Sequence, residues 1–268
     1  MTVKSVFKSF VPPALVSLVR KIRKNEGIQF SGNYPTWQAA LDAAGGYDTP
    51  AILARVREAA LKVKHGEAVF ERDSVCFYHE EYRWPTLACL LRVAAENDGK
   101  LRVLDFGGSL GSFYFQHRKH FRDLKEVRWS VVEQPHFVAC GREEFQDDVL
   151  KFYESIDDCM AAGTVDVVFC SSVLEYLEKP YEILGSMARS GVPYILFDRT
   201  PFIEGDCDRL TVQHVPVTIY PASYPAWFFS SVRFEQELSK MGLKKVVEFD
   251  GEDDVGIGAF RGILLARS

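Results

Sequence analysis

The sequence of 268 residues lacks the patterns that mark several common classes of site. Its six cysteines are scattered, with no C-x-x-C pair and no histidine at metal-ligand spacing. We therefore expect no metal site and reduced thiols, which suits a cytoplasmic location. No apolar run approaches the length of a membrane span, and no signal-peptide pattern opens the chain.

An excess of positive charge is also missing. The chain has 32 Lys and Arg against 37 Asp and Glu, which gives a net charge of −5. No global basic field is available to recruit a polyanion, so we predict no nucleic-acid partner. The composition is 47% hydrophobic and 26% charged, as expected of a globular protein with a substantial core.

The N-terminal segment, residues 1–30, departs from this average. Residues 1–24 hold six Lys and Arg and no acid, and subtracting these six from the 32 basic residues leaves 26 against 37 acidic residues, a net charge of −11. Apolar residues accompany the positive ones, so the segment could lie on an anionic membrane surface and hold the protein at the inner face of a membrane. The alternative is a helix that docks on the rest of the chain or frays, and Pro12–Pro13 interrupts any single long helix.

The stretch 31–100 has the pattern of helices. One helix is predicted from Thr49 as N-cap to Gly66 beyond its end, and a second from Trp84–Pro85 to Asn97. Residues 70–78 form a connection between them. We expect this stretch to be a helical extension that covers the rest of the protein like a lid.

The most informative stretch is 101–111, LRVLDFGGSLG. An apolar run ends in an acid, a glycine-dense turn follows, and a helix-like segment comes next, which predicts a strand, a tight turn and a helix N-terminus. Glycine allows unusual φ angles and lets a ligand approach the backbone closely. The spacing is that of neither a dinucleotide fingerprint nor a P-loop.

From residue 101 onward strands and helices alternate, which predicts a mostly parallel sheet covered on both faces. Strands are expected near 101–106, 127–133, 149–153, 165–170, 193–198, 244–249 and 261–267. We predict an α/β fold with a Rossmann-like sheet of seven strands and treat 101–268 as one domain. Residues 198–229 stand out in it as a long insertion rich in prolines and aromatics. Such insertions are usually functional, and this one follows a strand end, where open α/β sheets bind ligands.

The glycine turn resembles motif I of class I S-adenosylmethionine-dependent methyltransferases, acid-x-Gly-x-Gly-x-Gly, with Ser109 in place of the middle glycine. VVEQ, SSVLEYL, DRTPF and IYPASYPAWFFS, together with DFGGSLGSFYFQ, also resemble a poorly characterised bacterial methyltransferase family associated with surface-polysaccharide genes. The likeness covers about residues 100–268. It implies a seventh strand that lies antiparallel beside the fifth.

The resemblance implies S-adenosylmethionine as cofactor and a set of residues that hold it. The methionine end would lie against the turn and the free N–H groups of the following helix, and an acid at the end of the second strand would hold the ribose. A residue past the third strand is a candidate for the adenine edge, or is simply loop surface, and a serine follows the fourth strand. These cofactor-binding candidates are Asp105, Gly107, Gly108, Gly111, Glu133, Glu154 and Ser171.

Candidates for the acceptor side come from the insertion. His214 titrates near neutrality and suits a general base, although a lone loop histidine is more often an ordinary polar residue. Asp198 could orient an acceptor hydroxyl or pair with Arg199, which could grip an anionic group. Tyr224 is placed near the methyl group, and Tyr220 and Trp227 could stack on the substrate, whereas Phe228 and Phe229 are more often core residues.

These observations predict a methyltransferase that acts at oxygen on a small-molecule or glycan-type acceptor. One alternative is a non-catalytic module that binds the cofactor and regulates a partner. Another is a nicotinamide-dependent oxidoreductase, which the glycine spacing and the absence of a Tyr-x-x-x-Lys pair disfavour. The oligomeric state has no signal in the sequence.

Overall fold

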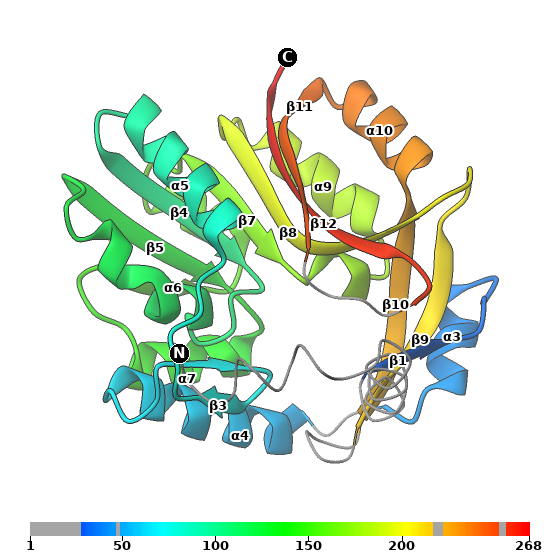
Figure 1. Cartoon of the computed structure of the whole chain (residues 1–268), viewed down its shortest axis with the longest axis horizontal. Coiled ribbons are helices and arrows are strands. Elements are labelled where there is room, and N and C mark those ends of the chain that lie inside the picture. Colours follow the sequence, from blue (N-terminus) through cyan, green and yellow to red (C-terminus); the bar gives the residue numbers. More distant parts are fainter. Residues whose placement is uncertain (1–27, 47–48, 217–221, 252–255) are drawn as a thin grey trace, which may run out of the picture.

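The computed structural model describes residues 28–46, 49–216, 222–251 and 256–268 (Figure 1). The basic segment 1–24, with its predicted membrane contact, and Tyr220 lie outside the described residues.

A mostly parallel sheet forms the centre of the protein (Figure 1). Its main part has the order β6-β5-β4-β7-β8-β12-β11, in which β4, β5, β6, β7 and β8 are parallel and β12 runs antiparallel between β8 and β11. This confirms the predicted seven-stranded Rossmann-like sheet with its antiparallel last strand. The strands are β4 (Lys100–Phe106), β5 (Glu126–Val132), β6 (Leu150–Tyr153), β7 (Val167–Ser171), β8 (Tyr194–Ile203), β11 (Leu243–Asp250) and β12 (Ala259–Arg267).

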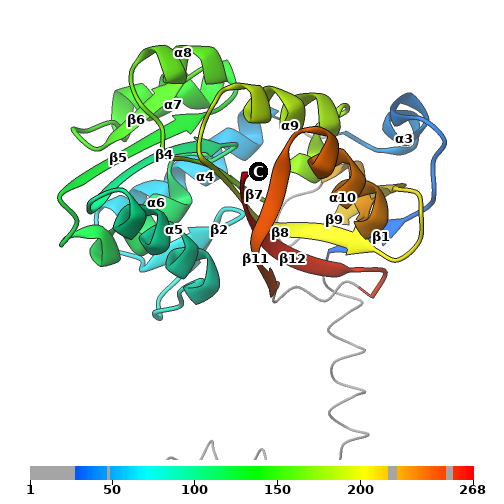
Figure 2. The same cartoon turned by 90° about the horizontal axis from the view of Figure 1, so that it is seen from above.

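Both faces of the sheet are covered by helices, because side chains along each strand alternate between two apolar cores. One core joins the sheet to α4 (Thr49–Lys64), α5 (Trp84–Glu96), α6 (Ser112–His117) and α7 (Pro135–Glu144). The other joins it to α8 (Ile156–Ala161), α9 (Pro180–Arg189) and α10 (Ser231–Lys240), and Figure 2 shows α8, α9 and α10 on the side opposite α5 and α6. Two short 3₁₀ turns, Arg118–Phe121 and η2 (Leu174–Tyr176), complete the connections.

The insertion after β8 forms regular strands where a proline-rich connection was expected. β9 (Arg209–Val215) pairs antiparallel with β10 (Ala222–Ser230), and the end of β10 runs parallel to the end of β8. β1 (Gln29–Ser31) adds to the other edge of β9, and α3 (Trp37–Ala43) packs against this smaller part of the sheet. Phe228 and Phe229 of β10 are fully buried, as their core interpretation predicted.

The stretch 31–100 is helical only in part. The expected helices are present as α4 and α5, and Gly66 follows α4 with the positive φ of +80° that ends helices. Residues 70–77, however, form a hairpin of β2 (Phe70–Arg72) and β3 (Val75–Phe77). α5 packs directly on the main sheet, so one core continues across residue 100. No helix among the described residues has the length and apolar character that a membrane crossing requires.

Candidate functional site

The glycine turn after β4 is shaped by positive φ angles at Gly107 (+73°), Ser109 (+55°) and Gly111 (+88°). A Cβ atom at Gly107 would overlap the side chain of Val173, and one at Gly108 would overlap the Asp105 carboxyl group. Ser109 holds a left-handed conformation that costs a non-glycine residue about 1–2 kcal/mol. The tight turn therefore explains the glycines at 107 and 111 and why the motif usually has glycine at position 109.

Asp105 ends β4 beneath this turn and is only 2% exposed. Its Oδ2 accepts a hydrogen bond of 2.8 Å from the indole N–H of Trp129. Burial raises the pKa of Asp105 to about 7, although the hydrogen bond from Trp129 favours the ionised form. A carboxyl group with this pKa is close to half ionised at neutral pH, and a bound cation favours its ionised form.

Glu133 follows β5 and lies beside the glycine turn, because the backbone N–H of Ser109 and that of Gln134 (2.7 Å) both donate to its carboxylate. Burial raises its pKa, while these two hydrogen bonds lower it. Glu154, in contrast, is exposed beyond β6, and its nearest cation is Arg142 at 3.9 Å.

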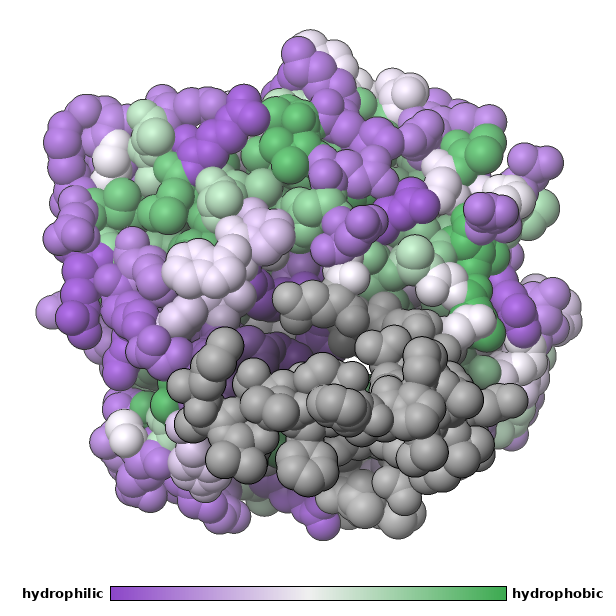
Figure 3. Space-filling model, in the orientation of Figure 1, coloured by the Kyte–Doolittle hydropathy of each residue, from purple (hydrophilic) through white to green (hydrophobic). Residues whose placement is uncertain are grey.

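A cavity of about 250 Å³ opens at the carboxyl ends of β4, β7 and β8. Figure 3 shows a recess among hydrophilic side chains near the centre of one face of the molecule. Of the predicted site residues, the cavity brings together Asp105, Gly107, Gly108, Ser171, Arg199 and Tyr224. Other predicted residues do not line it, namely Gly111, Glu133, Glu154, Asp198, His214 and Trp227.

The inserted strands contribute a polar network to one wall of this cavity. The buried side chain of Gln213 on β9 accepts a hydrogen bond from the Tyr176 hydroxyl (2.8 Å) and donates one to the Tyr224 hydroxyl (3.1 Å). The two tyrosine rings meet edge to face at 5.3 Å. Burial raises the pKa of Tyr176, so its hydroxyl stays protonated at neutral pH and can act as a donor. Arg199 lines the same region with a left-handed backbone (φ +53°).

His214 and Trp227 lie elsewhere. Side chains alternate along a strand, so His214 faces away from the cavity that its neighbour Gln213 lines; it is exposed and 2.9 Å from the Ser31 hydroxyl. The Trp227 indole donates to the Leu177 carbonyl (3.1 Å), and its ring stacks on Trp37.

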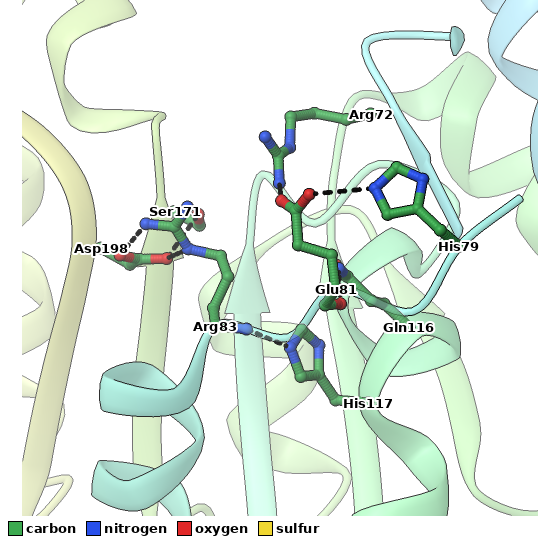
Figure 4. A network of polar contacts seen from close by, with 8 residues as sticks. All are labelled: Arg72, His79, Glu81, Arg83, Gln116, His117, Ser171 and Asp198. Carbon is green, nitrogen blue, oxygen red and sulfur yellow. Dashed lines mark hydrogen bonds and ion pairs between the residues drawn. The ribbon is translucent and has the colours of Figure 1, made fainter. Parts of the chain in front are cut away.

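Asp198 is fully buried and is bound on both oxygens by one arginine. Arg83, at the start of α5, donates from Nε to Oδ2 (2.6 Å) and from Nη2 to Oδ1 (2.8 Å) (Figure 4). The sequence had left open an ion pair with Arg199, the next residue in the chain, as the alternative to a role toward the acceptor. Both carboxylate oxygens of Asp198 are thus already engaged within the protein. Ser171 lies 3.4 Å from the same carboxylate.

Several polar residues of the cavity wall were missed by the sequence interpretation, among them Glu71, Arg83, Tyr176 and Gln213. Gln213 could have been found by its alternation with His214 once the segment was recognised as a strand. Glu71 and Arg83 lie in a segment whose alternating pattern is too short to indicate the hairpin. Among the described residues, no three His, Cys, Asp or Glu side chains gather as a metal site would require.

Comparison with known proteins places the fold. No family model matches the chain, and no curated protein matches its sequence. The structure of magnesium protoporphyrin IX methyltransferase from Synechocystis PCC 6803 with bound S-adenosylhomocysteine matches 82% of this chain and 100% of that one, with a TM-score of 0.50 and 13% identity.

Two further structures are an amino pentose methyltransferase from Micromonospora echinaspora (TM-score 0.49, 13% identity, 80% of this chain and 97% of that one) and the N-terminal domain of EvdMO1 (TM-score 0.47, 14% identity, 83% and 98%). The chain has the fold of the class I methyltransferases. At these identities the likeness extends to the fold and not to the reaction.

Proposed function

We propose that this protein is an S-adenosylmethionine-dependent methyltransferase that acts at oxygen on a small-molecule or glycan-type acceptor. The observation that carries the proposal is one cavity lined on one side by the glycine turn after β4 and on the other by the polar side chains of β9 and β10. In open α/β sheets this edge binds ligands, and here a wall suited to the donor and a wall suited to the acceptor face the same cavity.

The residues at the turn fit this cofactor. Gly107 and Gly108 leave bare backbone at the cavity wall, and Asp105 is a buried carboxyl group with a pKa near 7, which suits a cationic ligand. Glu133, beside the turn, would accept hydrogen bonds from the ribose hydroxyls. When bound, the cofactor supplies a methyl group on a cationic sulfur, with its own leaving group.

The wall formed by Tyr176, Gln213 and Tyr224 would hold the acceptor. Hydroxyl and amide groups both donate and accept, so this network can orient a neutral hydroxyl in line with the methyl group. This chemistry suits a hydroxylated acceptor such as a sugar, in keeping with the resemblance to polysaccharide-associated methyltransferases. Alignment would then carry the transfer, and the hydroxyl proton would pass to solvent, since Asp198 is bound by Arg83 and His214 lies outside the cavity.

The positions of Asp198, bound by Arg83, and of His214, outside the cavity, also favour a second candidate. This candidate is a module that binds the cofactor without turnover and regulates a partner. Two measurements decide between the candidates. Calorimetry with S-adenosylmethionine, S-adenosylhomocysteine and NAD should show binding of the first two alone. Incubation with radiolabelled cofactor and fractions of a bacterial lysate should then transfer label to a product. Binding without labelling of any fraction would favour the regulatory module, and no binding of either cofactor form would overturn both.

A further inference from the structure

A second buried carboxylate, Glu71, lines the cavity beside the glycine turn. Glu71 belongs to the hairpin β2–β3 and is 6% exposed. The turn of this hairpin, Asp73–Ser74, has positive φ at both residues (+52° and +66°), as two-residue hairpins of type I′ require. The tight turn places the two turn residues, together with Glu71, at the cavity wall.

The segment that carries Glu71 is fastened along the helix that follows the glycine turn. The hydroxyl of Ser112, the first residue of α6, donates to Glu71 Oε1. One turn later Gln116 donates to the Glu81 carbonyl (2.7 Å), and His117 accepts the backbone N–H of Arg83 (3.1 Å) (Figure 4). These contacts hold Glu71 in place beside the glycine turn.

The neighbours of Glu71 leave its charge without a cationic partner among the described residues. Its hydrogen bonds come from the Ser112 hydroxyl and the Ser74 backbone N–H (3.2 Å). Arg72, the adjacent cation, turns instead to Glu81 at 2.9 Å, as Figure 4 shows. Burial raises the pKa of Glu71, and the nearby Asp73 adds to the effect. A buried carboxylate pairs with a cation or gives up its charge, and the cavity that Glu71 lines can admit a cationic group.

Arg83 brings a positively charged guanidinium group to the wall of the same cavity. Two of its five N–H donors bind Asp198, which leaves three for another anionic or polar group. The segment 71–83 thus presents to one cavity both an acid and a guanidinium group. A ligand that carries an ammonium and a carboxylate on one carbon satisfies both.

We propose that Glu71 binds the ammonium group of a zwitterionic amino-acid head, with Arg83 facing its carboxylate, so that a hairpin outside the methyltransferase sheet completes the cofactor site. The proposal rests on the proposed function, because the ligand with such a head is the methionine end of S-adenosylmethionine. It assigns the hairpin to the donor side of the cavity, where Glu71 is then a third carboxylate for the cofactor beside Asp105 and Glu133.

The test compares two ligands by calorimetry at pH 7.5. S-adenosylhomocysteine carries the amino-acid head, whereas 5′-methylthioadenosine lacks it. Glu71→Gln keeps the size of the side chain but removes its charge and one of its two acceptor oxygens. This variant should bind S-adenosylhomocysteine about 10–100-fold more weakly, on the scale of a lost charge-assisted hydrogen bond, and methylthioadenosine as the wild type does.

Glu80→Gln is the matched control, since Glu80 is an exposed carboxylate of the same segment that pairs with Lys119 and does not line the cavity. It should leave the affinity for both ligands unchanged. If Glu71→Gln binds S-adenosylhomocysteine as tightly as the wild type, or loses both ligands equally, the assignment of Glu71 is wrong while the proposed function stands. If the wild type binds no S-adenosylhomocysteine, the proposed function fails and this inference with it. Should Glu71→Gln not fold, Glu71→Asp takes its place, with the same selective loss expected and an equal loss of both ligands as the contrary result.

Discussion

Arg83 and Asp198, 115 residues apart, form a bidentate ion pair that joins the start of α5 to strand β8 inside the protein. Their N···O distances are 2.6 and 2.8 Å, and the two residues are 9% and 0% exposed. Such a pair stabilises one arrangement of its elements only while both partners are present, because each partner alone leaves a buried charge. It fixes the floor of the cavity and occupies the carboxylate predicted to act on the acceptor.

Removal of either partner should destabilise the protein strongly. Arg83→Met or Asp198→Leu alone should lower the free energy of unfolding by about 3–5 kcal/mol, because the remaining charge is buried without a partner. The double variant should lose much less than the sum of the two. Urea denaturation of the three variants measures this coupling, and the exposed pair Lys125–Asp98 supplies a control in which Lys125→Met changes little. Additive losses would show that the pair has no energetic coupling.

The neighbours Gln213 and His214 on β9 offer a matched pair of substitutions, because they face opposite sides of one strand. Gln213→Leu should reduce methyl transfer into the labelled lysate fraction by at least about 10-fold, since it removes both hydrogen bonds to the tyrosines. His214→Ala should keep full transfer. Both should bind S-adenosylhomocysteine normally. A loss of about 10²–10⁴-fold in His214→Ala would restore the original prediction of a histidine base.

Glu133→Ala should weaken the binding of S-adenosylmethionine by about 1–3 kcal/mol, the scale of a lost hydrogen bond to a charged group. The reason is its position beside the glycine turn, at the end of β5. Glu126→Ala removes an exposed carboxylate from the opposite end of the same strand and should not change the affinity. Titration calorimetry of the two variants checks this, and equal affinity in both would exclude the ribose role.

Residues 1–24 remain a prediction from sequence. If they lie on an anionic membrane surface, the full chain should co-sediment with phosphatidylserine-containing vesicles, and a variant that begins at residue 25 should not. Binding should fall as salt is added, because surface attraction is screened within about 8 Å at physiological ionic strength. Salt-insensitive binding, or a shortened protein that no longer folds, would instead support a helix docked on the rest of the chain.

The sequence predicts the main sheet well because that sheet is built from local patterns. Each strand is a short apolar run followed by a turn signal, so the pattern alone locates β4 and β5 to within one residue at each end. The smaller sheet could not be predicted in this way. Its pairing of Gln29 with His214 joins residues 185 positions apart, and Pro225 lies within β10, where proline usually argues against a strand.

The candidate site likewise has one part that a local sequence pattern could predict and another part that it could not. The glycine turn carries its own backbone requirement, so Gly107 and Gly108 could be assigned from spacing. The residues of the opposite wall could not be assigned in this way. They are the side chains on one face of β9, and that face can be predicted only once the segment is recognised as a strand. Asp198 was predicted to end its strand, but β8 continues to Ile203, so Asp198 lies within the strand. Its partner Arg83 lies at the start of a helix, and no local pattern links the two residues.

Asp105 should make cofactor binding depend on pH. Its pKa of about 7 in the folded protein lies above the ordinary value of 3.8, because burial favours the neutral form. Between about pH 4 and pH 7 the unfolded chain has lost this proton and the folded chain has kept it, so the free energy of unfolding falls as the pH rises through this window.

A bound cationic ligand reverses the preference of Asp105 for its neutral form, since the ligand's charge favours the ionised carboxylate. S-adenosylmethionine should therefore bind with release of a proton below about pH 7, and its affinity should rise with pH up to about 7 and then level off. Calorimetry in buffers of different ionisation enthalpy measures the proton count. Asp105→Asn, which can still accept the Trp129 hydrogen bond, should weaken this dependence and leave the contributions of Glu71 and Glu133, whose pKa values are also raised by burial. A wild type whose affinity does not change between pH 6 and pH 8 would show that Asp105 does not face the cation.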